Sequence, residues 1–519
     1  MFACIYIPNF PLAAVVRAEP ELKTRSVAIF EGKPPLEKII AVNESATCLA
    51  ITPGMTKTQA ELCAELTLRA RSSLQESAMH AALLDCAQSF SPCVEDTACD
   101  TALLDLTGME SLFGSPAEIS RAIAHRAAGL GLIPNVATAA NPDAALLAAR
   151  GFSGITVIPA GREAGTLGAL PLDVLFAAQL EGEEKKEADT LLETLERWGI
   201  RNLRSLAALP EIALSERLGQ EGPQLQKLAR GSIFRTLVPV EAPLVFEEGM
   251  ELEHPIVLLE PLAFLLNRLL EQLCARLGSR ALATQELKLI LELDICKQRS
   301  EISKQQFIRT LRLPLPILDA KVFLKLLQLD LNAHPPGAPI VKIHLAAEPA
   351  RPRAGQGGLF LPPSPEPEKL ELTLARIAGM VGEQNVGSLE MLDTHHPEGF
   401  RMRRFVSEVA RRVPQKRNPD AEEARSAVTA LRRYRPVLRA EVSLENRQPA
   451  RVVCPRKKEV QGDVLWKAGP WRFSGDWWER EPWSRDEWDV ALQAGESIAL
   501  YRLVHDLLGG GWVVEGMYD

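Results

Sequence analysis

A segment rich in Pro and Gly, residues 348–370, limits most strongly what this chain can fold into. Its composition is typical of a linker and leaves few side chains for a buried core. The chain is therefore expected to fold as a body before this segment and a tail after it. Its length of 519 residues also exceeds what one hydrophobic core supports, and roughly three or four domains are expected.

The body before the linker changes its pattern along the chain. Residues 1–165 alternate short strands with helices, which predicts a mixed sheet covered by helices. A wholly helical unit and then an α+β unit follow. We expect these parts: 1–165, 166–238, 239–347, a linker at 348–367, a helical basic segment at 368–435 and a Trp-rich module at 436–519. The predicted fold class is multidomain α/β and α+β.

Charge is distributed unevenly. The net charge is −8, yet residues 401–440 hold twelve Lys and Arg against four Asp and Glu. A local basic face on an acidic protein is compatible with nucleic-acid binding that is modest and sensitive to salt. A solvated basic helix without a ligand explains the same residues equally well.

Cysteine spacing and hydropathy bear on the compartment. The nine cysteines lie far apart without a CxxC pair, so neither structural zinc nor a disulfide framework is expected, and a reducing cytoplasm fits. The sequence has no apolar run long enough for a membrane-spanning helix. Its first residues lack the basic region of a signal peptide and are typical of a strand.

Four short motifs occur in an order that resembles the Y-family of translesion DNA polymerases, the UmuC type. They are the turns at 42–47 and 53–55, the strand at 100–108 and the hairpin region at 198–206. Each is weak alone, but together they support a resemblance over residues 1–345. It implies a right-hand architecture of palm, fingers, helix-hairpin-helix thumb and little finger. A C-terminal aromatic-rich module containing β-strands would follow.

The positions that carry catalysis in that family are altered here. The family uses three carboxylates from two strands to hold two magnesium ions, and the matching positions are Tyr6, Asp100 and Thr101. One carboxylate cannot hold two ions that together carry about four positive charges. Asp105 lies about 16 Å further along the strand and is not a substitute.

The phosphate-binding positions change in the same direction. The family's Tyr and Arg correspond to Glu44 and Thr47, and a Lys before the palm helix corresponds to Asp143. Glu44 would repel a triphosphate, and Thr47 offers one neutral hydrogen bond. We therefore expect an inactive nucleotidyltransferase homologue without metal, nucleotide or cofactor. Two alternatives stay open: a weakly active, distributive polymerase with a rearranged metal site, and a DNA-binding module without a clamp role.

The thumb-like region keeps basic residues but lacks the Gly-x-Gly hairpin that members of the family usually have. The matching stretch, residues 180–187, is acidic. Residues expected to contact the DNA backbone are Arg201, Arg204, Lys227, Arg230 and Arg235. Helices packed only for core stability would carry the same residues, so DNA binding by the chain alone is expected to be weak.

Within the linker, Gln356, Leu359 and Phe360 resemble a sliding-clamp-binding motif. A flexible segment can offer Leu359 and Phe360 to an apolar pocket while the Gln356 amide fixes the orientation. Two glycines inside the motif raise the cost of ordering it. The alternative is a pair of apolar linker residues packed on the neighbouring domain.

Seven of the eight Trp residues lie between positions 466 and 512, which marks a separate aromatic module. Together with the body and linker, this tail resembles the ImuB-like, catalytically degenerate branch of the Y-family in the bacterial mutasome. That resemblance implies an adaptor in damage-induced mutagenesis. It would bind the sliding clamp and bring an error-prone C-family DNA polymerase and a RecA-like ImuA-type protein to damaged DNA.

The Trp cluster has two further interpretations at the level of residues. Trp471, Trp477 and Trp478 are candidate partner-binding residues, because Trp is enriched at interface hot spots. Most of the cluster is nevertheless expected to form the core of a small β module, with one or two Trp exposed. Stacking on single-stranded DNA is disfavoured by the acidic residues between them.

Overall fold

The computed structural model describes residues 1–176, 182–294 except 234 and 242, 305–352, parts of 370–403, and 430–519 except 458, 479–481 and 495–496. The chain forms two compact units, Met1–Val381 and Gly382–Asp519. No helix in the described part of the chain is both long and apolar enough to cross a membrane.

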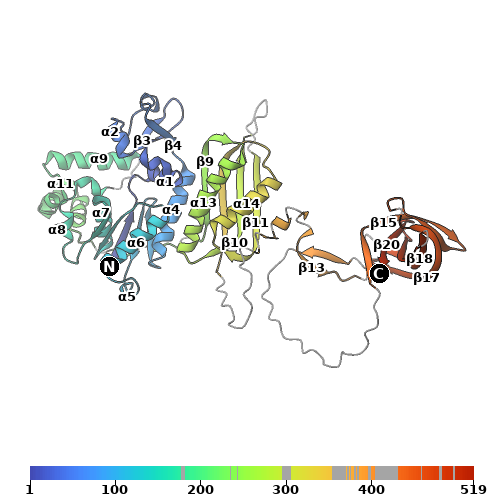
Figure 1. Ribbon diagram of the computed structural model, residues 1–519. Helices are drawn as coiled ribbons and strands as arrows, with labels where there is room; N and C mark the ends of the chain where they lie inside the picture. The colour runs from blue at the N-terminus through green and yellow to red at the C-terminus, as the bar shows by residue number, and fades with distance from the viewer. Residues whose placement is uncertain are drawn as a thin grey trace. The chain divides into compact units, whose positions relative to one another are not determined.

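A five-stranded sheet in the order β5-β6-β1-β7-β8 is the centre of the first unit (Figure 1). Its strands are β1 (Phe2–Tyr6), β5 (Val94–Ala98), β6 (Thr101–Asp105), β7 (Asn135–Ala139) and β8 (Ile155–Val157). Ile5 on one face packs in the core with the helices α4 (Ser73–Gln88) and α6 (Pro116–Gly129). Cys4 on the other face packs with α7 (Pro142–Gly151). This layered arrangement confirms the mixed sheet that the sequence pattern predicts.

A smaller sheet, β3-β2-β4, lies beside the five-stranded sheet, which we call the palm-like sheet (Figure 1). Its elements are β2 (Ser26–Glu31), β3 (Lys38–Val42), β4 (Leu66–Ala70) and the short helices α2 (Glu44–Cys48) and α3 (Lys57–Ala60). The short helix α5 (Glu110–Phe113) packs instead against α6. Helix α1 (Phe10–Ala18) joins the two sheets, with Leu12 and Val15 in a core with β2. Asn9, just before α1, donates a 2.7 Å hydrogen bond to the Val42 carbonyl. The turn after β1 is therefore fixed to the end of β3.

The next part is wholly helical within the described residues, as the sequence predicts. Its helices are α8 (Glu163–Leu167), α9 (Gly182–Arg197), α10 (Leu203–Ala207), α11 (Glu211–Leu218) and α12 (Glu221–Ala229). Gly199 has φ +79°, a conformation suited to glycine after a helix end. The core of this thumb-like part is continuous with the α7 side of the palm-like sheet. The two parts therefore pack as one body.

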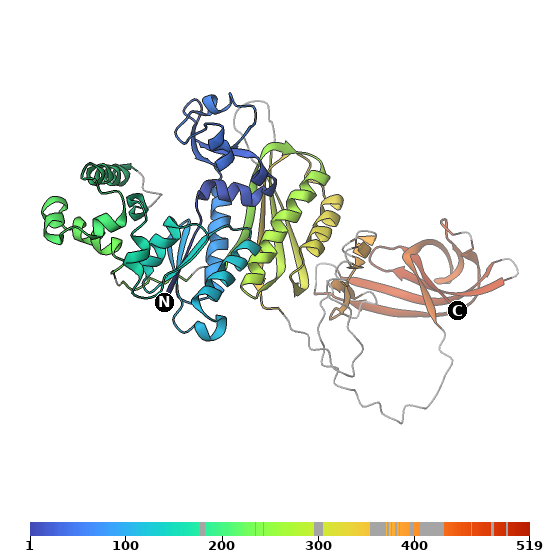
Figure 2. The ribbon, with the colours of Figure 1, turned by 60° about the vertical axis from the view of Figure 1, so that its left-hand side comes forward.

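A four-stranded antiparallel sheet in the order β11-β10-β12-β9 forms the little-finger-like part (Figure 2). Its elements are β9 (Phe246–Ile256), α13 (Leu259–Ser279), β10 (Ala283–Leu293), β11 (Gln305–Ile317), α14 (Ala320–Ala333) and β12 (Ile340–Ala350). Both helices cover one face of the sheet and form a Leu-rich core with it. The α+β unit predicted from the sequence is therefore present.

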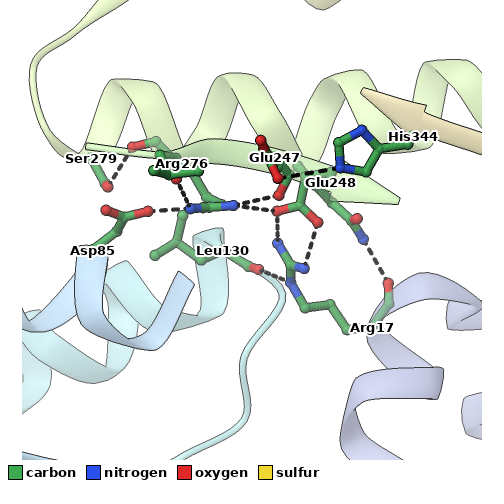
Figure 3. A network of polar contacts seen from close by, with 10 residues as sticks. Arg17, Asp85, Leu130, Glu247, Glu248, Arg276, Ser279 and His344 are labelled. Atoms are coloured by element: carbon green, nitrogen blue, oxygen red, sulfur yellow. Dashed lines mark hydrogen bonds and ion pairs between the residues drawn. The ribbon is translucent and has the colours of Figure 1, made fainter. Parts of the chain in front are cut away.

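Buried charges join this sheet to the palm-like part (Figure 3). Arg17 of α1 forms two 2.9 Å hydrogen bonds with the Glu248 carboxylate of β9. Arg276 of α13 donates to Asp85 of α4 at 2.8 Å and to Glu248 at 3.3 Å. The side chains of Arg17, Glu248 and Arg276 are no more than 4% exposed. We call these four residues the palm–finger ion network.

The second unit is a closed barrel of six strands, β15 to β20, beside a two-stranded hairpin. The barrel strands are β15 (Leu431–Glu445), β16 (Gln448–Val453), β17 (Gln461–Gly475), β18 (Trp483–Ala494), β19 (Ser497–Asp506) and β20 (Trp512–Tyr518). The hairpin consists of β13 (Ser388–Met391) and β14 (Phe400–Arg403). The last two strands, β19 and β20, pair as an antiparallel hairpin, in agreement with the β-strands expected in the C-terminal module.

Two expectations for the tail are wrong. Residues 388–391 and 400–403 are strands inside a segment predicted as helical. Polar and apolar residues alternate along both stretches, which is the pattern of a strand. The Trp cluster is not mainly core: only Trp488 of the described Trp side chains in this unit is fully buried, whereas Trp466, Trp471, Trp477 and Trp478 are exposed. The barrel interior is small and is filled by Val, Leu and Tyr side chains together with Trp488.

Candidate functional site

The pairing of β1 with β6 brings together Tyr6, Asp100 and Thr101, the three positions that match catalytic carboxylates in the resemblance. Tyr6 lies directly opposite Thr101, and the Ile7 amide donates to the Asp100 carbonyl at 2.9 Å. Asp100 is 4% exposed, and its carboxylate accepts a 2.7 Å hydrogen bond from the Thr101 hydroxyl. The end of the two strands therefore presents one carboxylate, one hydroxyl and one phenol.

The charges around this cluster come from both strands and from α7. Burial first, and then the Asp100 carboxylate, raise the pKa of Tyr6, so the phenol is neutral at physiological pH. The Arg150 guanidinium acts in the opposite direction on Tyr6 and also on buried Cys4. Among the described residues, no group of three or more His, Cys, Asp or Glu is placed to hold a metal ion. A cation of the chain itself thus acts on Tyr6.

Sequence reasoning missed Arg150 and placed Asp143 in the phosphate pocket instead. Tyr6 pairs with Asn135 and Phe2 with Ala139, so α7 starts at the end of β1 that is remote from Tyr6. Asp143 lies in the first turn of α7 and Arg150 in its last turn. Arg150 could have been found from the sequence. A helix that follows β7 reverses direction, so its last turn returns to the end of β1 where Tyr6 lies.

The turn at residues 42–47, which matches the phosphate-binding turn in the resemblance, contains no Lys or Arg. We call it the phosphate-type turn. Asn43 caps α2 by accepting a 2.9 Å hydrogen bond from the Ala46 amide, and Glu44 is exposed in the first turn of the helix. The Thr47 hydroxyl donates back to the Asn43 carbonyl at 3.1 Å. The Thr47 hydroxyl oxygen can still accept a hydrogen bond, but a hydrogen-bond acceptor does not attract a phosphate. The turn is built to stabilise itself and carries a negative charge where it faces solvent.

The thumb cations fall into two groups. Arg201, Arg204 and Lys227 are exposed. Arg230 donates from two nitrogens to the Ala207 carbonyl, at 3.0 and 2.7 Å. Arg235 is half-buried and forms the ion pairs described next. The first three side chains are therefore the ones that can reach a phosphate without first leaving a partner inside the chain.

Arg235 holds the segment between the thumb-like and little-finger-like parts against the palm-like sheet. It lies 2.7 Å from Glu95 and 2.9 Å from Asp143. Glu95 also accepts from the Val238 amide at 2.9 Å. Burial alone would raise the pKa of Glu95, but the hydrogen bonds from Arg235 and Val238 hold it below its ordinary value. This geometry gives Arg235 a structural partner and accounts for the acidic residue at position 143.

The open face of the little-finger-like sheet is more acidic than basic. The strand registers place alternate residues of β9 to β12 on this face. Its charged residues are Glu247, Glu251, Glu286, Glu292 and Glu348 against Lys288, Arg312 and Lys342. Arg312 and Lys342 are already paired with Glu side chains of the face. The face therefore carries a net negative charge and offers little to a phosphate backbone.

The clamp-type motif and most of the basic stretch lie outside the described residues. Gln356, Leu359 and Phe360 fall within 353–369, and residues 404–429 fall within the basic stretch. The candidate partner residues Trp471, Trp477 and Trp478 are described and exposed. They come from the end of β17 and from the turn that follows it.

Comparison with known protein families identifies the N-terminal part of the chain. Residues 5–150 match the impB/mucB/samB family. These residues form an impB/mucB/samB-family domain. Its span includes Tyr6, Glu44, Thr47, Asp100 and Thr101, and it extends through α7 to Arg150. The altered positions thus belong to the matched domain itself.

Relatives of this chain include proteins named DNA polymerase IV and one named Protein ImuB. The chain is 34% identical over 230 residues to DNA polymerase IV of Dehalococcoides mccartyi strain CBDB1, which covers 43% of this chain and 55% of that protein. It is 23% identical over 359 residues to Protein ImuB of Caulobacter vibrioides strain NA1000, covering 68% and 72%. The chain therefore spans just over half the length of this DNA polymerase IV.

Among solved structures, DinB from Sulfolobus solfataricus matches with a TM-score of 0.39 and 16% identity, over 68% of this chain and all of that one. A ternary complex of Dbh matches with a TM-score of 0.38 and 16% identity.

Proposed function

We propose that this protein is a non-catalytic adaptor in damage-induced, mutagenic translesion synthesis. The observation that carries the proposal is the β1–β6 register, which gathers Tyr6, Asp100 and Thr101 with one carboxylate between them. Two divalent cations and a triphosphate need several anionic ligands and nearby cations. The exposed Glu44 at the phosphate-type turn supports the same conclusion.

The adaptor would act in the cytoplasm through four kinds of partner. The linker motif Gln356, Leu359 and Phe360 would bind the sliding clamp. The tail, including Trp471, Trp477 and Trp478, would bind an error-prone C-family DNA polymerase and a RecA-like ImuA-type protein. DNA would be bound weakly, through Arg201, Arg204 and Lys227, with Arg230 and Arg235 serving first to hold the fold. The homology to Protein ImuB supports this assignment of partners.

A weakly active, distributive polymerase is the second candidate. It is favoured by the homologues named DNA polymerase IV and by the retained Asp100. It lacks the carboxylates that the reaction requires at positions 6 and 101. The two candidates make opposite predictions for primer extension and identical ones for clamp binding.

One experiment with two readouts separates them. The full chain is mixed with primer-template DNA, deoxynucleotides and Mg²⁺, and in parallel with the sliding clamp on a sizing column. We expect no extension, and a clamp complex that is lost when Leu359→Ala is combined with Phe360→Ala. Extension that disappears on Asp100→Ala would establish the polymerase. A clamp complex that survives the double substitution would remove the linker motif from the proposal.

A further inference from the structure

The hairpin β13–β14 of the second unit has one apolar face, and this face is exposed. Leu389 is paired with Met402, and Met391 with Phe400. Paired residues share a face, and so do residues two apart in a strand, so these four side chains lie on the same side. Leu389 is 67% exposed and Met391 82% exposed. A hairpin of two strands is only marginally stable in water, so a ligand that covers this face would stabilise it.

The first half of β15 adjoins this apolar face through a cation. The Arg435 guanidinium lies 5.4 Å from the centre of the Phe400 ring. Arg439 points away from the barrel core, because its neighbours Leu438 and Ala440 pack against that core. Arg435 and Arg439 are exposed, and no carboxylate of the described residues lies within ion-pair distance of either. We call this set the hairpin–β15 surface: Leu389, Met391, Phe400, Met402, Arg435 and Arg439.

Arginine is in excess on these strands. β13, β14 and residues 431–440 of β15 contain six Arg against one acid. The four Arg other than Arg435 and Arg439 have acidic partners, which are Glu390, Glu515 and Asp519. Two exposed acids, Asp393 and Glu441, flank the strands. Cations still outnumber acids here, and Arg435 and Arg439 are not neutralised by a partner.

The combination of unpaired cations and exposed apolar side chains fits a single-stranded nucleic acid. Its phosphates attract Arg435 and Arg439, which do not first have to leave a carboxylate. Its unpaired bases offer apolar faces that can lie on Phe400, Leu389 and Met391. A duplex offers the same phosphates, but its bases are stacked on one another and do not reach these side chains. An acidic peptide matches the charge but has no bases to place on the hairpin.

We propose that the hairpin–β15 surface binds single-stranded DNA. Phosphates pair with Arg435 and Arg439, and unpaired bases cover the apolar face of the hairpin. This contact is separate from the thumb cations and is made by the second unit alone. The choice of DNA rests on the proposed function, in which damaged DNA is a partner, whereas the exposure and the unpaired cations come from the structure of the second unit.

The test uses the full chain and three labelled probes in fluorescence anisotropy: a 30-residue oligo-dT strand, a 20-base-pair duplex and an amphipathic 18-residue Leu/Glu peptide. We expect oligo-dT to bind at least fivefold more tightly than the duplex and at least tenfold more tightly than the peptide. Arg435→Gln combined with Arg439→Gln should weaken oligo-dT binding at least fivefold. In a KCl series this double variant should lower the salt slope by about 1.4, since each phosphate contact to a single strand contributes about 0.7.

A second variant, Met391→Ser, separates the bases from the phosphates. It should weaken oligo-dT binding at least threefold and leave the salt slope unchanged, because it removes apolar contact and no charge. Its control is Leu508→Ser, at an exposed residue of the β19–β20 turn. The control for the Arg pair is Arg121→Gln with Arg447→Gln, which removes two exposed Arg from α6 and from the turn after β15. Both controls should change binding less than twofold, and circular dichroism checks that each variant folds.

Three results would overturn the proposal. Duplex binding that equals oligo-dT binding and falls equally in the Arg435 and Arg439 double variant would make the surface a general phosphate-binding site. Peptide binding that is tighter than oligo-dT binding would make an acidic protein the occupant. Oligo-dT binding that is unchanged in the double variant and in Met391→Ser would remove DNA from this surface. None of these results depends on primer extension or on the clamp, so the adaptor proposal and this one fail separately.

Discussion

Three residues decide whether the adjoining ends of β1 and β6 can hold a metal ion: Tyr6, Thr101 and Asp100. Tyr6 and Thr101 are paired across β1 and β6, which places their Cβ atoms about 5 Å apart. We expect Tyr6→Asp combined with Thr101→Glu to gather three carboxylates and to create a saturable Mn²⁺ site, because a hard divalent cation requires anionic oxygen ligands. Isothermal titration calorimetry measures the binding, and the natural chain is expected to show none at millimolar Mn²⁺.

A further substitution, at Arg150, tests the same prediction. The positive charge of Arg150 reaches Tyr6 and opposes another cation there, so adding Arg150→Gln should tighten Mn²⁺ binding about tenfold, which is about 1.4 kcal/mol. Tyr6→Asn with Thr101→Gln is the neutral control of matching shape and should not bind. Saturable Mn²⁺ binding by the natural chain that is lost on Asp100→Asn would show that the site has kept its metal.

At the scale of elements, the palm–finger ion network fixes β9 and α13 against α1 and α4. Glu248→Gln leaves Arg17 buried with a neutral partner, whereas Arg276 keeps Asp85 at 2.8 Å. We expect a loss of about 3 kcal/mol or more in the free energy of unfolding, because an uncompensated buried charge is costly. Urea unfolding of the full chain, followed by near-ultraviolet circular dichroism, should show an earlier transition.

The control is Glu253→Gln. Glu253 lies in β9, as Glu248 does, and its half-exposed side chain is paired with Arg69 of β4. A surface ion pair contributes roughly 0–1 kcal/mol, so this variant should unfold almost as the natural chain does. Equal shifts in the two variants would mean that burial does not set the strength of the network and that it does not hold the parts together.

Local patterns in the sequence predicted elements well and long-range sites poorly. Period-two and period-3.6 patterns predicted the mixed sheet of residues 1–165, the helical unit after it and the α+β unit, and the structure has all three. The palm–finger ion network joins Arg17 to Glu248, 231 positions away, and no local pattern carries that information. Trp466 alternates with its neighbours as a strand residue does, but alternation does not say which side the barrel covers.

At the scale of the whole molecule, acidic surface limits DNA binding. The open face of the little-finger-like sheet has more Glu than Lys and Arg, so this sheet adds little to the thumb cations that can neutralise phosphates. We expect Glu247→Lys, Glu251→Lys and Glu348→Lys together to raise affinity for a 20-base-pair duplex at least tenfold at low salt. Fluorescence anisotropy across a KCl series should show a steeper slope, by about 0.9 for each new phosphate contact.

The matched control reverses the same number of exposed charges on the barrel, with Glu441→Lys, Glu445→Lys and Glu459→Lys. It changes net charge equally but leaves the sheet untouched. Because the Debye length is about 10 Å at moderate salt, charges away from the duplex should add little, and the control should move affinity less than threefold. If both triple variants bind alike, net charge alone governs DNA binding, and the little-finger-like sheet has no particular part in excluding the duplex.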